Sequence, residues 1–369
     1  MPGTVYYPAL FMSITKKAFM IVLTIFIALA AGIAVFVNQP SFGRNPQGER
    51  LARVKKSPNY KNGQFQNELP TEVMTGNKSG FRTMWEFLTE KRTNLRPEEP
   101  VPSVRTDLKS LPEDKDYIVW FGHSAYMLQL SGKKIIVDPA LLSGSPVSFV
   151  NRPYPGTEIY SPDDMPDADF LIISHDHWDH LDYKTAMAMK SRIKHIITPL
   201  GVGEHFEYWG FPKDILTELD WHESAELEGF GFQCLPARHF SGRSLTRNKT
   251  LWGSFLIKTP NGKTIYIGGD SGYGPHFKYI GEHYPGLTLA ILENGQYNED
   301  WSQIHTMPAQ LTQEMRELKA KKYITVHHSK YTLSKHSWDD PLKAEKQAAE
   351  ESNTDLAVLT IGQPYEIRR

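Results

Sequence analysis

Residues 174–182 read Ser-His-Asp-His-Trp-Asp-His-Leu-Asp, and they directly follow the apolar stretch Asp-Phe-Leu-Ile-Ile, which is typical of a buried strand. His175 and His177 are two residues apart, so at the end of an extended strand their side chains leave on the same side. Asp179 and His180 follow after the chain has begun to turn, and they can approach the same point from another direction. Because imidazole and carboxylate groups are ordinary ligands of zinc and similar metals, this stretch predicts a metal site rather than a solvated polar loop.

Three further residues of the same chemical types stand at the ends of strand-like stretches later in the chain. His239 follows one such stretch, and Asp270 and His327 each end another. The spacing His-x-His-x-Asp-His, completed by these residues in this order, resembles the metallo-β-lactamase superfamily. The resemblance implies an α/β fold, an αβ/βα sandwich of two mixed sheets with outer helices. It also implies one metal held by His175, His177 and His239, and a second held by Asp179, His180 and His327, with Asp270 bridging the two.

The resemblance extends over about residues 117–341 and is more specific than the metal motif. It includes Trp-Phe-Gly-His-Ser at 120–124, Val-Asp-Pro at 137–139, His-Phe-Ser-Gly-Arg at 239–243, Thr-Leu-Trp-Gly at 250–253, Gly-Asp-Ser-Gly-Tyr at 269–273 and Gln-Ile-His at 303–305. These motifs resemble the N-acyl-phosphatidylethanolamine-hydrolysing phospholipase D subfamily and its bacterial relatives. Two segments depart from that pattern. The last ligand is usually followed by Trp-Gly-Thr but here by His-Ser-Lys, and residues 293–297 match only in part, which leaves the substrate open.

Two adjacent cations would lower the pKa of a water between them from near 16 toward about 7, and the resulting bridging hydroxide is a nucleophile at neutral pH. The metals would also stabilise the charge that develops in the transition state. We therefore expect a hydrolase, and the resemblance favours a phospholipase D-like phosphodiesterase acting on N-acyl or related phospholipids. The alternatives are a lactonase or other ester hydrolase, or a non-catalytic metal- and lipid-binding module. The ligands favour two zinc ions, although manganese and iron accept the same groups.

Ligand histidines need a hydrogen-bond partner on their other ring nitrogen. By sequence proximity or family position, we expect Asp138, Asp182 and the Ser174 hydroxyl to supply such partners. Asp176, between two predicted ligands, is expected to point away from the metals or to be a solvated carboxylate. The position of His123, after a glycine at a strand end, favours a structural role as a hydrogen-bonded histidine over a catalytic role.

Other residues are predicted to meet the substrate. Asp270 and His305 are the predicted catalytic residues, and His305 would orient a phosphate or donate a proton to the leaving group. Tyr273 and Tyr297 are predicted to contact the substrate. His328 could exchange roles with its neighbour, but alignment on the following aromatic residue favours His327.

The chain begins with a short segment, 1–17, followed by the uncharged stretch 18–37, which as a helix would be about 30 Å long and could cross a bilayer. A cleavable signal peptide is the alternative, but the apolar stretch is longer than a usual signal core. Lys16 and Lys17 favour a catalytic domain outside the cytoplasm, whereas the basic residues after the span oppose that orientation. The expected location is therefore the membrane, with a single pass and a slight preference for the extracytoplasmic side.

Residues 38–104 are predicted to form a tether and wrapping segment, and 105–369 the hydrolase domain. Within it we expect strands at 117–121, 126–130, 134–138, 170–174, 195–198, 230–235, 254–258, 264–268, 287–292 and 323–326, and helices at 183–190, 201–208, 307–318 and 342–352. With 41 Lys and Arg against 42 Asp and Glu, the charge balance predicts no nucleic-acid partner. The expected partners are a lipid or small-molecule substrate and the membrane, and the oligomeric state stays open. The single cysteine excludes an intramolecular disulfide.

Overall fold

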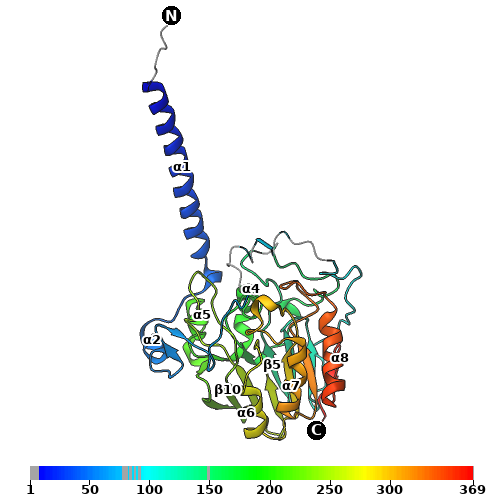
Figure 1. Ribbon diagram of the computed structural model, residues 1–369. Coiled ribbons are helices and arrows are strands. Elements are labelled where there is room, and N and C mark those ends of the chain that lie inside the picture. The colour runs from blue at the N-terminus through cyan, green and yellow to red at the C-terminus, as the bar shows by residue number, and fades with distance from the viewer. Residues whose placement is uncertain are drawn as a thin grey trace, which may run out of the picture. The chain divides into compact units, whose positions relative to one another are not determined.

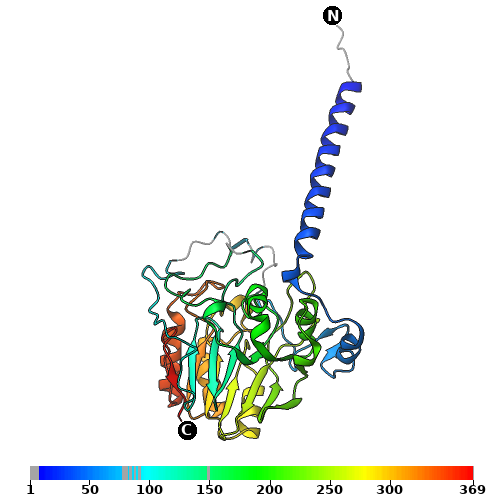
Figure 2. The ribbon, with the colours of Figure 1, turned by 180° about the vertical axis from the view of Figure 1, so that it is seen from behind.

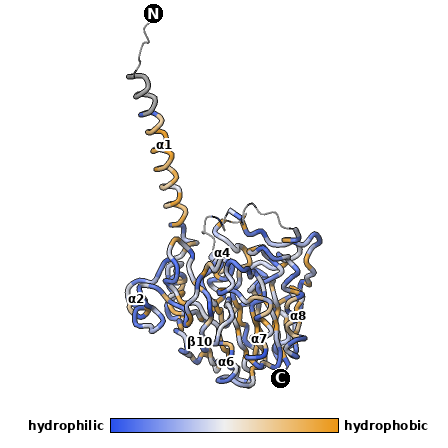
Figure 3. The backbone as a smooth tube through the Cα atoms, viewed as in Figure 1, coloured by the Kyte–Doolittle hydropathy of each residue, from blue (hydrophilic) through white to orange (hydrophobic). Residues whose placement is uncertain are grey.

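The computed structural model describes residues 8–76, 82, 85, 86, 89, 93–147 and 150–368. It has two compact units, Met1–Phe42 and Gly43–Arg369. The described part of the first unit is helix α1, Pro8–Val37, with a short 3-10 turn at Pro40–Phe42. Its segment Lys16–Val37 is apolar after the two lysines at its start, buries none of its residues, and is long enough to cross a membrane (Figure 3).

The second unit contains two sheets that pack face to face (Figures 1 and 2). The larger sheet has the order β15-β3-β4-β5-β6-β7-β8, with β3 Tyr117–Trp120, β4 Tyr126–Leu130, β5 Lys133–Val137, β6 Ala168–Ile172, β7 Ile193–Pro199, β8 Leu216–Leu219 and β15 Tyr365–Glu366. The smaller sheet has the order β14-β13-β12-β11-β10-β9, with β9 Ser224–Leu227, β10 Phe230–Leu235, β11 Ser254–Lys258, β12 Thr264–Ile267, β13 Leu289–Glu293 and β14 Tyr323–Val326. A small hairpin joins β1 Tyr60–Lys61 to β2 Gln64–Phe65.

Helices cover the outer faces of both sheets. They are α4 Tyr183–Met189, α5 Gly203–Tyr208, α6 His276–His283, α7 Pro308–Leu318 and α8 Asp340–Ser352, whereas α2 Gly48–Val54 contributes Val54 to the core between the sheets. Residues of α4 and α5 share a core with the larger sheet, and residues of α6, α7 and α8 share one with the smaller sheet. A third core fills the space between the sheets. Central strands are therefore buried on both faces, as the continuous apolar runs in the sequence require, and the predicted αβ/βα sandwich is confirmed.

The topology brings the polar strand ends together. Strands β12, β13 and β14 are parallel, and at or just after their carboxyl ends stand Asp270, Glu293 and His327. In the other sheet, β5 and β6 are parallel, and the histidine-rich stretch 174–182 follows β6. Because parallel strands end at the same edge of a sheet, the fold gathers these residues at one edge of the sandwich.

Candidate metal centre

Three of the predicted ligands present ring nitrogens to one point. Nε2 of His175 lies 2.8 Å from Nδ1 of His177, and Nε2 of His239 lies 3.2 Å from that same Nδ1 atom. His175 and His239 are almost fully buried. The strand end that carries the histidine-rich stretch and the strand end after β10 therefore meet at a cluster of three imidazoles.

Hydrogen bonds on the far side of two of these rings determine which nitrogen carries the lone pair. The Ile304 carbonyl accepts a 2.8 Å bond from Nδ1–H of His239. The Ser174 hydroxyl donates to Asp138, so its oxygen accepts from Nδ1–H of His175 at 3.0 Å. Each neutral ring therefore presents a bare Nε2 to the cluster. Burial and neighbouring imidazoles lower the pKa of both rings well below the usual value, which keeps them neutral. Converging lone pairs of this kind fit a divalent cation.

A second group of predicted ligands lies beside the first. Nδ1–H of His180 donates to Asp138 at 2.9 Å, and its Nε2 is buried without a hydrogen-bond partner among the described residues. That Nε2 lies 3.2 Å from Oδ2 of Asp270 and 3.7 Å from Oδ2 of Asp179. Nδ1 of His327 lies 3.1 Å from the other oxygen of Asp270. A buried imidazole nitrogen facing two carboxylates is a donor set that suits a metal ion.

Asp270 lies between the two groups, as the predicted bridge should. Its Oδ2 is 3.2 Å from His180, 3.8 Å from Nε2 of His239 and 4.0 Å from Nε2 of His175. The structure thus brings all seven predicted ligands together. Their donor atoms form overlapping clusters that fit a pair of cations.

The two carboxylates expected to hold ligand histidines behave differently. Asp138 accepts from the ring of His180 and from the backbone and hydroxyl of Ser174. Asp182 instead caps helix α4, accepting from the backbone of Lys184 and from the backbone and hydroxyl of Thr185. The prediction that Asp182 holds a ligand histidine is wrong, because its carboxylate satisfies the free N–H groups of a helix start.

Two buried residues join the site although the sequence argument did not place them there. His123 was expected to be a hydrogen-bonded structural histidine, and it is hydrogen-bonded to a predicted ligand, with its Nε2 2.8 Å from Oδ2 of Asp179. Glu293 was not singled out as a site residue, and its Oε2 accepts a 2.7 Å bond from Nδ1–H of His305. The sequence feature that could have indicated His123 is the Gly-His-Ser motif. Glu293 could have been indicated by its place at the end of a strand that lies in sequence between the strands leading to Asp270 and His327.

Asp176 points away from the clusters, as expected, but it is buried rather than solvated. Its carboxylate accepts from the backbone of Gly242 at 2.7 Å, the hydroxyl of Thr250 at 2.8 Å and Nε2–H of His205 at 3.0 Å. The buried Arg243 donates to the carbonyl oxygen of Asp176 at 2.9 Å. These contacts give the motifs at 239–243 and 250–253 a structural role: their residues hold the histidine-rich stretch in place through Asp176, on the side away from the ligand clusters.

The choice between the two adjacent histidines agrees with the geometry. His327 is a member of two of the candidate ligand groups, and His328 is in none of those found among the described residues. His328 packs its ring against Trp120 and hydrogen-bonds Thr325 and Ser329. His328 is therefore a buried core residue outside the candidate ligand groups.

A cavity of about 260 Å³ opens over the clusters. Its wall is formed by Val73, Met74, His177, Asp179, His239, Phe240, Arg247, Asp270, Gln296, Trp301, Ile304, His305, His327 and Leu333. Tyr273 and Tyr297, predicted to contact the substrate, are not on this wall. The Tyr273 hydroxyl donates to Glu317, and the ring of Tyr297 stacks on His336. The predicted catalytic residue His305 does face the cavity.

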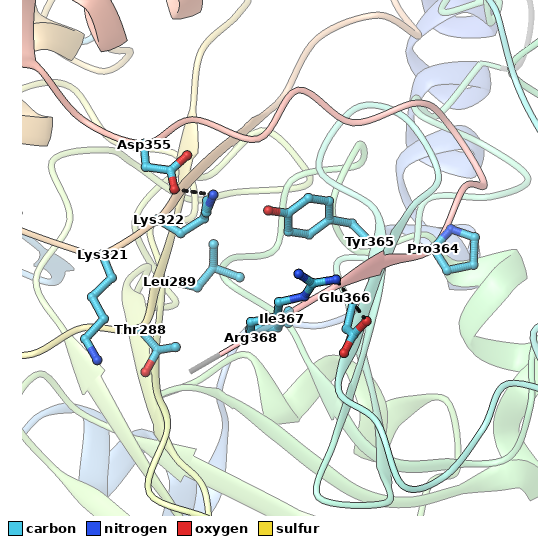
Figure 4. A pocket seen from close by; sticks show the side chains of 10 residues that line it. All are labelled: Thr288, Leu289, Lys321, Lys322, Asp355, Pro364, Tyr365, Glu366, Ile367 and Arg368. Atoms are coloured by element: carbon cyan, nitrogen blue, oxygen red, sulfur yellow. Dashed lines mark ion pairs between the residues drawn. The ribbon is translucent and has the colours of Figure 1, made fainter.

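A larger hollow of about 580 Å³ lies elsewhere, beside β15 (Figure 4). Lys322 on its wall pairs with Asp355, and Arg368 lies 3.7 Å from Glu366. Two of its basic side chains thus face carboxylates. None of the predicted metal ligands is among its described lining residues.

Comparison with known proteins gives consistent matches. Residues 134–328 match the sequence profile of the Beta-lactamase superfamily domain. The chain is 34% identical over 318 residues to an uncharacterised protein of Mycobacterium tuberculosis, a match that covers 84% of each chain. It is 30% identical over 274 residues to N-acyl-phosphatidylethanolamine-hydrolyzing phospholipase D 1 of Caenorhabditis elegans, covering 68% of this chain and 75% of that protein.

The fold also matches that of solved proteins. Igni18, a metallo hydrolase from Ignicoccus hospitalis, superposes with a TM-score of 0.52 at 19% identity, over 69% of this chain and 99% of that one. Three observations indicate the same family: the matching sequence profile, the relatives that match over most of the chain, and the clustered histidines and carboxylates. The chain belongs to the metallo-β-lactamase superfamily and is a metal-dependent hydrolase.

Proposed function

We propose that this hydrolase cleaves the phosphodiester of N-acylated or related phospholipids, in the manner of a phospholipase D. The observation that carries the proposal is that five of the predicted ligands and several apolar side chains line the wall of one cavity. Phe240, Trp301 and Leu333 belong to that wall. An acyl chain placed there would leave water, which is worth about 25 cal/mol per Å² of apolar surface buried.

One basic side chain on the wall suits the charge of the phosphodiester. The guanidinium of Arg247 lies 5.2 Å from the centre of the Phe240 ring, so this cation stands beside an apolar surface. A guanidinium binds phosphate oxygens through two parallel hydrogen bonds. The combination favours an anionic amphiphile over a small neutral lactone. Similarity to the C. elegans phospholipase supports the same substrate class.

In this proposal His175, His177 and His239 hold one metal, and Asp179, His180 and His327 hold the other, with Asp270 shared. Divalent ions held there would supply an activated water and neutralise the phosphate. Hydrolysis would join a water oxygen to phosphorus and break the bond from phosphorus to the N-acylethanolamine oxygen, which then needs a proton. His305 faces the cavity and is placed to give the departing oxygen its proton. The products are phosphatidate and N-acylethanolamine.

We propose that α1 anchors the enzyme in the bilayer that contains its substrate. The segment Lys16–Val37 has 22 residues, which as a helix measure about 33 Å and match the hydrocarbon thickness. Lys16 and Lys17 at its start favour the extracytoplasmic side for the catalytic unit, and the basic residues after the span oppose it. Sodium carbonate extraction of membranes from an expressing strain should leave the full chain in the membrane pellet.

The test of the activity is turnover of N-acylphosphatidylethanolamine by the full chain in mixed detergent micelles, with products identified by mass spectrometry. Phosphatidate and N-acylethanolamine should form together, and Asp270→Asn should abolish both. The matched control is Asp167→Asn, because Asp167 is exposed. Hydrolysis of esters or lactones without phosphodiester cleavage would replace the proposal by a lactonase or esterase. Bound metal without any turnover would indicate a non-catalytic binding module.

A further inference from the structure

Glu293 is the one carboxylate among the candidate ligand groups that the predicted ligand set does not use. It is the last residue of β13, in the segment that departs from the family pattern, and it is only 3% exposed. Burying a carboxylate is unfavourable unless each oxygen finds donors. Its surroundings therefore show what it does.

Both carboxylate oxygens of Glu293 are satisfied, and by different parts of the site. Oε1 accepts from the backbone N–H of Ser271 at 3.1 Å and from that of Thr306 at 2.8 Å. Oε2 accepts from Nδ1–H of His305 at 2.7 Å. One side chain thus joins the loop after Asp270 to the segment that carries His305.

The bond to Nδ1 determines how the His305 ring is presented. A carboxylate has no hydrogen to donate, so Nδ1 of His305 must carry one, and Nε2 is the atom left for the substrate. The ring stacks on His327 at a centroid distance of 5.3 Å and meets the His239 ring edge-on at 5.1 Å. These contacts leave it little freedom to rotate, and His305 lines the cavity.

We propose that Glu293 is a positioning residue for His305, fixing the ring so that Nε2 faces the scissile phosphodiester. This rests on the proposed function for its substrate, but the geometry of the pair applies to any ester cleaved at the same centre. The role is separate from metal binding, because both oxygens of Glu293 are already occupied by N–H donors.

The substitution Glu293→Gln separates positioning from a structural role. The amide oxygen of glutamine can still accept from Ser271 and Thr306, so the loops stay joined. Its NH₂ group then faces Nδ1 of His305, which must accept instead of donate, so the ring can no longer carry hydrogens on both nitrogens. A neutral ring gives up its Nε2 hydrogen less readily than the imidazolium whose Nδ1–H Glu293 holds. We expect wild-type metal content and thermal stability, with kcat lowered on the order of 10- to 100-fold and KM within about twofold.

A double-mutant cycle with His305→Ala gives the readout that a structural role would not produce. If Glu293 acts through the imidazole, Glu293→Gln should change kcat by less than about twofold in the His305→Ala background. An equal loss of kcat in both backgrounds, or an unchanged kcat in Glu293→Gln alone, would overturn the proposal. The cycle is run on whichever ester the wild-type chain hydrolyses, so a failed phospholipase assignment does not decide it.

A second measurement does not depend on turnover. In the zinc-loaded full chain, the imidazole ¹⁵N signals of His305, assigned by their absence in His305→Ala, should show Nδ1 carrying a hydrogen. In Glu293→Gln that nitrogen should be bare. A bare Nδ1 in the wild-type chain would refute the assignment.

Discussion

Replacing Asp176 by asparagine should loosen the stretch that carries the metal-binding residues, although Asp176 faces away from them. Its Oδ1 accepts from Gly242, and its Oδ2 accepts from both Thr250 and His205. The backbone N–H of Arg44 donates to Nδ1 of His205, so the other ring nitrogen carries the hydrogen that Asp176 receives. Three donors therefore converge on one buried carboxylate.

The magnitude follows from this count of donors. An asparagine has one acceptor oxygen, so in its better orientation the oxygen takes the place of Oδ2 and the NH₂ group faces the N–H of Gly242. One hydrogen bond to a charged group is lost and one buried donor is left without a partner. Each hydrogen bond to a charged group contributes about 1.5–3 kcal/mol, so we expect the free energy of unfolding to fall by about 2 kcal/mol.

Urea unfolding of the full chain in detergent, followed by tryptophan fluorescence, measures the change. With an m-value of about 3 kcal/mol/M, a loss of 2 kcal/mol lowers the unfolding midpoint by about 0.7 M. Asp167→Asn removes an exposed carboxylate just before β6, the strand that leads into the same stretch, and should leave the midpoint unchanged. An Asp176→Asn midpoint equal to that of the wild type would refute the reasoning, because it would mean that the buried contacts contribute nothing to the fold.

Four other substitutions, in three experiments, test separate parts of the account. Asp138→Asn should weaken metal binding about 10- to 100-fold in a chelator competition, since it removes the acceptor that orients a ligand histidine; unchanged affinity would contradict that role. His327→Asn should lose bound metal by elemental analysis whereas His328→Asn should not, and the reverse result would exchange the two residues. Burial opposes ionisation of Asp116, but its hydrogen bonds, of which that from Lys263 at 2.6 Å is the largest contributor, lower its pKa. The pair of Asp116 and Lys263 therefore stabilises the fold at neutral pH, and this contribution is lost as the pH falls through the acid range. Asp116→Asn should therefore lose about 3 kcal/mol at neutral pH and show a flatter decline toward acid in urea titrations; a decline as steep as that of the wild type would rule this out.

The central strands were predictable because they are buried on both faces. Strands β4 and β11 begin and end where the apolar pattern places them, as does β14, which is fully buried although it lies at a sheet edge. Strands β8 and β9 were not predicted, because both lie at sheet edges, are half exposed and carry polar residues. A four-residue strand shows no clear alternation of apolar and polar residues when neither of its faces is fully buried, so its sequence does not predict a strand.

The ligands were predictable from local spacing and from strand ends, and so were Asp138 and Ser174 among the groups that hold them, whereas the other groups were not. His123 meets Asp179 across 56 residues of sequence, and no local pattern indicates that contact. Asp182 was misassigned because an aspartate before a helix and an aspartate beside a metal site look alike in sequence. Gly272 shows the same limit. A Cβ there would lie 2.0 Å from the carbonyl oxygen of Gln303, so the glycine is required by a close approach that only the fold reveals.

The most direct test of the central claim, that these residues hold two metal ions that drive hydrolysis, is reconstitution of the chelated full chain with zinc while phosphodiester turnover is followed. The account predicts that activity disappears on chelation and returns in proportion to added metal up to about two ions per chain, with no recovery in Asp270→Asn. Turnover that persists in the metal-free chain, or that saturates without binding of a second ion, would contradict it.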